Sequence, residues 1–197
     1  MANPSFELAG ERGNAFAGWY QLGEVSVSQD VVPHGAFAAK VTGVSPGNWD
    51  VSGLWQELER PCGESWSDSV WSASVYVAHD AAKPLTAGSR AILNIEWYPE
   101  SGDPTLESYN IANAGTPAGV MQKVSVQIGP APQGTETLRF LLGVVQDPEE
   151  PPAEVFFDLA ALNPPRLNER QWAEFPMGRS VNFAGRSWRV KGSANVR

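Results

Sequence analysis

The chain has 197 residues, a formal net charge of −8 and a hydrophobic fraction of 42%. That fraction is enough for a packed core and excludes the intrinsically disordered class. The acidic balance excludes nucleic acid and anionic membranes as partners, because both need clustered Lys and Arg. A single cysteine, Cys62, excludes an internal disulfide and a cysteine-built metal site.

Gly (19) and Pro (16) divide the chain into short segments rich in β-branched and aromatic residues. Two of these segments, 15–22 and 106–114, are expected to hold at most a turn of helix. Many short strands at this spacing predict an all-β chain, a β-sandwich or jelly roll of two antiparallel sheets. We expect strands at residues 24–28, 36–42, 53–58, 70–79, 90–98, 120–128, 138–145 and 155–159.

The charge changes sign near Asn163. Residues 1–163 have a net charge of −13, whereas residues 164–197 have +5. The dipeptide Pro164-Pro165 at this point is typical of a linker. The remaining segment is too short to bury a core of its own. We therefore predict a sandwich over 1–163, followed over 164–197 by a linker and the truncated start of another domain, or by a tail packed on the sandwich.

One predicted strand, 90–98, carries the clearest candidate ligand groups. Asn94, Glu96 and Tyr98 share one face of it, opposite a face of three large apolar residues. Rings stack on the apolar faces of pyranoses, while amides and carboxylates hydrogen-bond to their hydroxyls. The combination is typical of a sugar-binding surface.

Further candidates lie on neighbouring segments. Tyr76 alternates with apolar residues and is expected to point away from the core. Trp49 and Trp66 lie in loops, so each either contacts a ligand or folds back on the core. Gln56 shares a strand face with two leucines, which favours the core for that face.

Catalytic residues are not expected. His34 and His79 have no nucleophile signature beside them. Glu57 and Glu59 are too close in sequence to lie on opposite sides of a sugar, and Glu96 has no evident partner carboxylate. The pattern favours binding over hydrolysis.

Three segments in order resemble one family. Residues 3–7 (Asn-Pro-Ser-Phe-Glu) with Gly18-Trp19, residues 35–41, and residues 155–162 (Val-Phe-Phe-Asp-Leu-Ala-Ala-Leu) are similar to the galactose-binding-like sandwich of carbohydrate-binding module families 4, 9 and 22. The resemblance implies a non-catalytic module that binds a β-glucan or xylan-like polysaccharide in a groove on one sheet. These families often place a glutamine such as Gln56 on the ligand-facing sheet, which leaves its role open. The candidate ligand set is Trp49, Gln56, Tyr76, Asn94, Glu96 and Tyr98.

The same resemblance implies a structural Ca²⁺ that ties the first and last strands together. Glu7 and Asp158 would supply carboxylates, and backbone carbonyls near Asp30 and Gly35 would complete the shell of six to eight oxygens. Alternatively, Glu7 caps a turn and Asp158 forms a surface pair.

The basic segment also has a resemblance. Residues 181–191 are similar to the first strands of family 16 glycoside hydrolases, although the E-x-D-x-E strand of that family is absent. This implies an attached catalytic domain and an extracellular protein, despite a start at Met1 that lacks signal-peptide features. The alternatives are a structural spacer that binds no sugar and an enzyme in its own right.

Overall fold

The computed structural model describes residues 1–11, 13–43, 51–61, 66–67 and 70–163, and the backbone of two short strands at 180–183 and 186–189. The chain divides into two units, Met1–Pro164 and Pro165–Arg197. Within the described residues there is no helix, and hence none long and apolar enough to cross a membrane.

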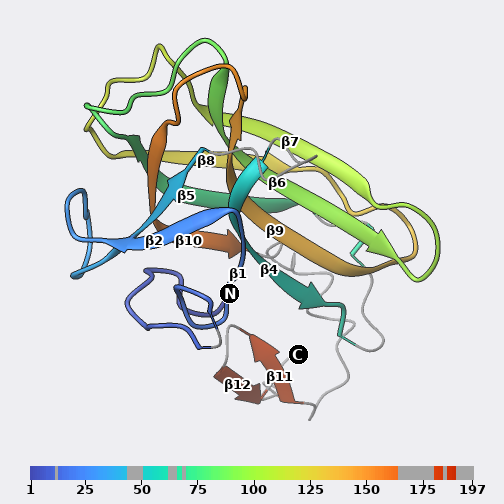
Figure 1. Cartoon of the computed structure of the whole chain (residues 1–197). Helices are drawn as coiled ribbons and strands as arrows, with labels where there is room; N and C mark the ends of the chain where they lie inside the picture. The colour runs from blue at the N-terminus through green and yellow to red at the C-terminus, as the bar shows by residue number, and fades with distance from the viewer. Residues whose placement is uncertain are drawn as a thin grey trace, which may run out of the picture. The chain divides into compact units, whose positions relative to one another are not determined.

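The first unit is a sandwich of two five-stranded antiparallel sheets (Figure 1). The first sheet has the order β1-β4-β9-β6-β7 and the second has the order β2-β3-β10-β5-β8. The predicted all-β sandwich of two antiparallel sheets is therefore confirmed. The strands are β1 (Tyr20–Leu22), β2 (Glu24–Ser28), β3 (Ala38–Thr42), β4 (Val51–Glu59), β5 (Trp71–His79), β6 (Ser89–Pro99), β7 (Thr105–Ala112), β8 (Gln122–Ile128), β9 (Thr135–Gln146) and β10 (Glu154–Asn163).

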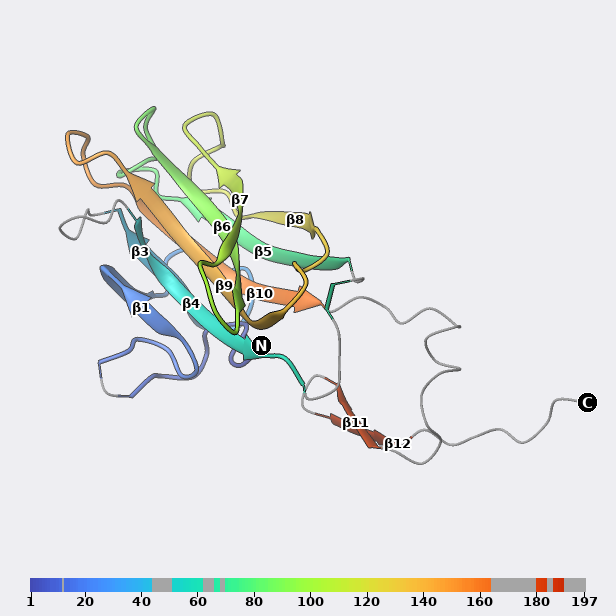
Figure 2. The ribbon, with the colours of Figure 1, turned by 90° about the vertical axis from the view of Figure 1, so that its right-hand side faces the viewer.

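The second unit contains an antiparallel hairpin of β11 (Ser180–Phe183) and β12 (Arg186–Arg189), also drawn in Figure 2. Its register pairs Ser180 with Arg189 and Phe183 with Arg186. The hairpin lies in the segment that resembles the start of a family 16 hydrolase, and that assignment stays a prediction.

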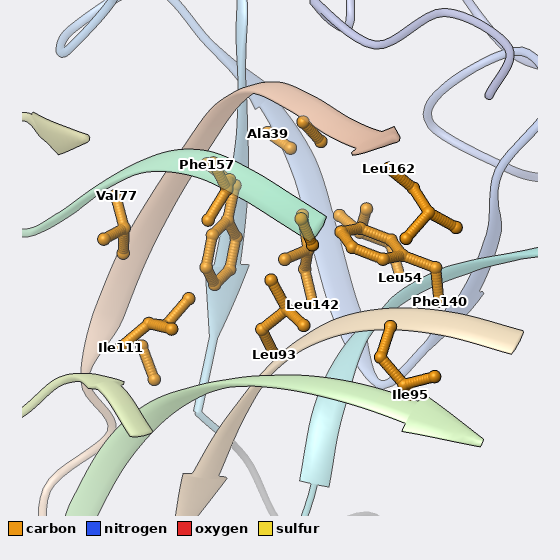
Figure 3. Close-up of a cluster of buried hydrophobic side chains, with 14 of the residues drawn as sticks. Ala39, Leu54, Val77, Leu93, Ile95, Ile111, Phe140, Leu142, Phe157 and Leu162 are labelled. Carbon is orange, nitrogen blue, oxygen red and sulfur yellow. The ribbon is translucent and has the colours of Figure 1, made fainter. Parts of the chain in front are cut away.

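The core lies between the sheets and follows the two-residue alternation of the strands. On β6 and β9 every second residue points inward, so that Leu93, Ile95, Phe140 and Leu142 are fully buried together. Phe157 of β10 meets them from the second sheet (Figure 3). The apolar faces predicted for the 70–79 and 90–98 strands are thus core faces.

Tryptophans fill one end of this core. Trp66 is only 7% exposed and packs edge-on against Trp71 and Trp97, with ring centroids 5.3 and 6.5 Å away. The possibility that Trp66 contacts a ligand is therefore wrong, because its ring is buried in the core. Trp19 is buried as predicted, its ring centroid 5.0 Å from that of Phe6.

Two segments expected to be at most helical turns are strands. Tyr20–Leu22 forms β1, and Thr105–Ala112 forms β7 at the opposite edge of the first sheet. The pattern of β7 misleads because a carboxylate, Glu107, lies among its inward-facing residues. Glu107 accepts hydrogen bonds from Trp97 Nε1 (2.8 Å), the Tyr109 hydroxyl (2.7 Å) and the Gly129 N–H (3.1 Å). Burial alone would raise the pKa of Glu107, but these bonds outweigh it and the pKa lies below its usual value.

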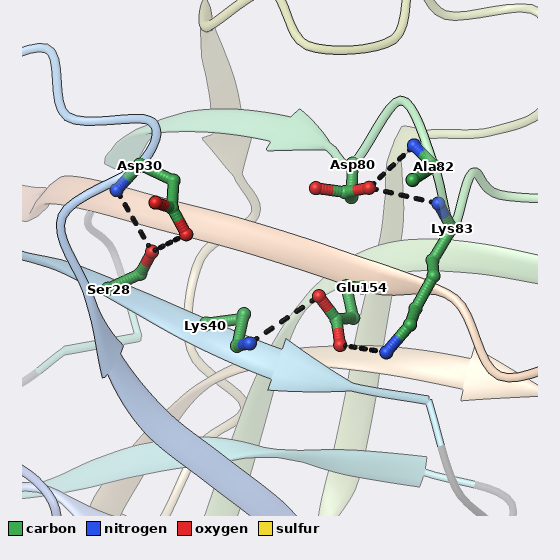
Figure 4. Close-up of polar contacts among 7 residues, drawn as sticks. All are labelled: Ser28, Asp30, Lys40, Asp80, Ala82, Lys83 and Glu154. Carbon is green, nitrogen blue, oxygen red and sulfur yellow. Dashed lines mark hydrogen bonds and ion pairs between the residues drawn. The ribbon is translucent and has the colours of Figure 1, made fainter.

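Ion pairs cover part of the outer face of the second sheet. Glu154 of β10 binds Lys83 at 2.6 Å and Lys40 of β3 at 3.5 Å (Figure 4). Asp80 accepts the N–H groups of Ala82 and Lys83 and so closes the turn after β5. These ion pairs join β3, β10 and the turn after β5 within the second sheet.

Candidate functional site

The outer face of the first sheet is built by the residues that alternate with the core. Registers place Glu57 of β4 directly opposite Arg139 of β9, and Arg139 directly opposite Glu96 of β6. Directly opposed cross-strand residues approach closely enough for their side chains to interact. The result is a row of alternating charges, minus, plus and minus, across three central strands.

Four planar groups stack across this face, and we call them the ladder: Tyr20, Trp55, Arg139 and Tyr98. The Tyr20 ring lies 5.6 Å from the Trp55 ring at an interplanar angle of 24°. The Arg139 guanidinium lies over Trp55 at 5.5 Å and over Tyr98 at 4.8 Å. The ladder therefore runs from the edge strand β1 through β4 and β9 to β6.

Hydrogen bonds fix the centre of the ladder. Arg139 donates from Nη2 (2.7 Å) and Nε (3.1 Å) to Oε1 of Glu57, and from Nη1 (3.0 Å) to Oε2 of Glu96. Burial would lower the pKa of Arg139, but the two carboxylates raise it above its usual value. Tyr98 donates to the same Glu96 oxygen at 2.6 Å. Burial, and then this hydrogen bond, raise the pKa of Tyr98 to about 12, so the phenol stays protonated.

Beside the ladder, two neighbouring central strands, β4 and β9, each carry a glycine on the outer face. Gly53 of β4 pairs with Gly143 of β9. A Cβ on Gly53 would lie 2.3 Å from the Leu142 carbonyl oxygen, so only glycine allows this approach. The pair leaves bare backbone flanked by a strip of apolar side chains that are buried although they lie on the outer face. The strip consists of Ile92, Leu141 and Val145, with Val51 and Trp55 packed against it.

Asn94 adds a polar group to the strip. It lies in the row of Trp55, Leu141 and Ser108 and is 8% exposed. Its Oδ1 is buried and accepts no hydrogen bond from the residues that the structure describes. An unpaired buried amide oxygen costs free energy, which a hydrogen-bond donor that reached this atom would recover.

The structure brings only three of the described residues of the predicted ligand set together. Asn94, Glu96 and Tyr98 lie together on the outer face of β6 as expected. Gln56 points inward, is 5% exposed, and exchanges hydrogen bonds with the Ala2 backbone, so the two leucines beside it indicated the right face. Tyr76 lies on β5 in the second sheet, opposite Lys123 of β8, and cannot share a surface with the first three. Trp49 lies outside the described residues.

The predicted metal residues approach the same loop from opposite ends of the chain. Glu7 Oε1 accepts the N–H groups of Ala36 (3.0 Å) and Phe37 (3.1 Å). Asp158 Oδ2 accepts the His34 N–H (3.2 Å), and Oδ1 accepts the Leu159 N–H (2.6 Å).

Donor chemistry at this loop fits a hard cation in part. Asp158 is 0% exposed, and burial raises its pKa to about 6 against the opposing hydrogen bonds. Gly35 has φ +77°, and a Cβ there would lie 2.1 Å from Oε1 of Glu7, so the loop closes tightly on that carboxylate. Among the described residues no three His, Cys, Asp or Glu side chains come together. A cation here would depend on backbone carbonyls for the rest of its shell.

Sequence reasoning missed the ladder residues Tyr20, Trp55 and Arg139, and the pairing of Glu57. A signal was present, because Trp55 and Glu57 alternate with the inward face of their strand. Their meeting with Arg139 depends on the register of β4 and β9, which are about 80 residues apart in sequence.

No protein-family model matches the chain, and none of the curated proteins is similar to it at a significant level. Solved structures are similar in fold. An arabinose-bound family 51 α-L-arabinofuranosidase matches at 16% identity and TM-score 0.57, over 85% of this chain and 26% of that one. The xylan-binding family 22 module of a Paenibacillus barcinonensis protein matches at 20% identity and TM-score 0.53, over 83% and 93%.

A third similar structure is the family 22 module joined to a family 10 xylanase of Clostridium thermocellum, complexed with xylohexaose. It matches at 15% identity and TM-score 0.54, over 84% of this chain and 28% of that one. The chain thus spans about a quarter of the two enzymes and nearly all of the isolated module. At these identities the likeness concerns the fold.

Proposed function

We propose that the chain is a non-catalytic carbohydrate-binding module that holds a β-glucan or xylan-like polysaccharide on the outer face of its first sheet. The observation that carries the proposal is the ladder beside the apolar strip. Aromatic rings, buried apolar side chains and a few oriented polar groups are the composition of a sugar site. Asn94, Glu96 and Tyr98 provide the hydrogen-bonding groups.

The charge arrangement favours binding over hydrolysis. A glycosidase needs one carboxyl group that donates a proton and a second that acts as base or nucleophile. Glu57 and Glu96 instead share one cationic partner, because the Arg139 guanidinium lies between them and forms an ion pair with each. Two carboxylates held by one guanidinium are suited to orienting rings and accepting hydroxyl protons in hydrogen bonds.

We also propose that Ca²⁺ binds between Glu7 and Asp158 and stabilises the fold. The ion would compensate the buried negative charge of Asp158, whose raised pKa records the cost of burial. It would join the N-terminal segment to β10 without taking part in sugar binding.

Attachment to a glycoside hydrolase and an extracellular location complete the proposal. The similar arabinofuranosidase and xylanase structures carry this fold as a quarter of a longer chain. A module on such a chain raises the local concentration of the catalytic domain at its substrate.

Affinity electrophoresis tests the binding site. The purified chain is run through gels containing laminarin, lichenan, xylan or hydroxyethyl cellulose. We expect retardation by one polysaccharide, lost in Trp55→Ala and in Tyr98→Ala because each removes a ring of the ladder. Tyr76→Ala is the matched control, since it removes a tyrosine from the second sheet and should leave retardation unchanged.

The spacer alternative makes the opposite prediction. No retardation in any gel, with or without calcium, would reject the sugar site. Retardation lost in Tyr76→Ala and kept in Tyr98→Ala would place the site on the other sheet.

A further inference from the structure

A cavity of about 510 Å³ lies at the edge of the first sheet, beside the start of β1. Its walls include Asn14, Trp19, Tyr20, Gln56, Glu57 and Leu58. The volume is within the range of about 300–1,000 Å³ that is usual for small-ligand sites.

The cavity exists because β1 is short. β1 pairs only with residues 53–55, while β4 continues to Glu59, and beyond Trp55 no described strand pairs with it on the β1 side. Directly before β1, Trp19 points into the core, with its ring 6.3 Å from that of Phe140. Tyr20 points the other way and is 54% exposed. Two neighbouring large rings that diverge in this way leave a hollow between the edge of β4 and the N-terminal segment.

The cavity is continuous with the outer face. Tyr20 lines it and is the first member of the ladder, stacked on Trp55. Glu57 lines it and holds Arg139, the third member. A ligand that lies across the ladder toward β1 therefore reaches the cavity without leaving contact with the protein.

We propose that this cavity is an end subsite, which takes the terminal sugar units of a bound glycan; the proposal rests on the proposed function. Both faces of Trp55 are occupied, by Tyr20 and by Arg139, whereas Tyr20 has a single stacked neighbour and is half exposed. The free face of Tyr20 is the stacking surface, and Trp55 supports it from behind.

Polar groups of the cavity suit sugar hydroxyls. Oε1 of Glu57 accepts the two hydrogen bonds that Glu57 receives from Arg139, and Oε2 of Glu57 accepts none of the described hydrogen bonds. The Asn14 side chain adds a donor and an acceptor. The Arg60 N–H donates to Glu136 on β9, so alternation directs the peptide groups of Glu57 toward the open edge of β4.

Isothermal titration with cello- and xylo-oligosaccharides of increasing length tests the subsite. Asn14→Trp fills the cavity while leaving the ladder intact, and Asn14→Ala removes the amide without adding bulk, in case the larger side chain disturbs folding. Tyr20→Ala removes the stacking face, and Tyr20→Phe keeps it. Tyr76→Ala is the control on the other sheet, and thermal unfolding checks the fold of each variant.

We expect Asn14→Trp and Tyr20→Ala to lower the affinity for long oligosaccharides about tenfold or more. For the shortest oligosaccharide that binds, Tyr20→Ala should lower the affinity less than it does for long ones, and Asn14→Trp should leave the affinity unchanged. Tyr20→Phe should bind every length like the wild type. If the variants lost affinity equally for oligosaccharides of every length, or lost none for any length, the end subsite would be rejected while the binding function would stand. A wild-type chain that binds none of the oligosaccharides or polysaccharides would reject the function and the subsite together.

Discussion

Replacing Arg139 by methionine removes the charge at the centre of the ladder while keeping much of the side-chain volume. Arg139 makes two partly exposed ion pairs, and such pairs are worth about 0.2–1 kcal/mol each. It also lies over two rings, and cation–π contacts at exposed sites contribute about 0.5–1 kcal/mol each. Together these contacts amount to about 2 kcal/mol. For a chain of this size that corresponds to a fall in Tm of about 4–8 °C.

The Arg139→Met variant should lose more of its free energy of unfolding at low salt than at high salt. Without Arg139, no cation lies between the carboxylates of Glu57 and Glu96, so the two negative charges repel each other. Salt screens this repulsion. Urea unfolding at low and high sodium chloride measures the effect, with Arg90→Met as the matched control, because Arg90 is exposed on β6 and has no described ion pair. Glycan affinity should fall about tenfold or more, since Trp55 and Tyr98 lose the group that spaces them. An Arg139→Met variant within about 0.5 kcal/mol of the wild type, and with unchanged affinity, would refute the role given to the ladder.

Two further predictions concern stability. Glu107→Gln should lower the free energy of unfolding at neutral pH by about 1–3 kcal/mol, because an amide cannot accept all three hydrogen bonds. Since the pKa of Glu107 is lower in the folded chain, its contribution is present above pH 4.5 and is lost as pH falls through the folded pKa, so the difference between variant and wild type should narrow in acid. Urea unfolding between neutral and acidic pH measures this, and a difference independent of pH would contradict it. For the metal, calcium at about 100 times its Kd should add about 2.7 kcal/mol near pH 7.5 relative to a chelator, measured by thermal unfolding. Without calcium, Asp158 favours folding below its ordinary pKa, because burial raises its pKa to about 6, and this contribution is lost as pH rises through 6. Below pH 6 the carboxyl group is mainly protonated and is a poor calcium ligand, so the stabilisation by calcium should shrink near pH 4.5. An Asp158→Asn variant should not respond to calcium; an undiminished response would reject the site.

The fold could be predicted largely from local patterns. Strands such as β5 and β6 place every second residue, mostly large and apolar, in the core, and turn residues separate them, so both their type and their inward faces follow from the sequence. β7 could not be predicted in this way, because Glu107 occupies an inward position that only the indole N–H of Trp97 and its other partners make acceptable. β1 has three residues, which is too few for any pattern to appear.

The site could be predicted only where one strand carries it. Asn94, Glu96 and Tyr98 are correctly grouped because alternation within a strand needs no knowledge of its neighbours. Tyr76 does not belong with them, because β5 and β6 are consecutive in the chain but lie in different sheets, which alternation within a strand does not indicate. Arg139 joins Trp55 and Tyr98 through registers that only the three-dimensional pairing provides.

The paired glycines at 53 and 143 limit how this protein can acquire a new ligand preference. A methyl group at Gly53 would lie 2.3 Å from the Leu142 carbonyl oxygen, and backbone cannot move aside as a side chain can. A methyl group at Gly143 would lie 2.9 Å from the Val51 side chain and 3.0 Å from the Ser52 carbonyl oxygen. Random mutagenesis at the centre of the face should therefore return mainly misfolded chains. A library aimed at altered glycan selectivity should hold both positions fixed and vary the margins, at Tyr20 and Asn14 on one side and at Ser108 and Asn110 of β7 on the other.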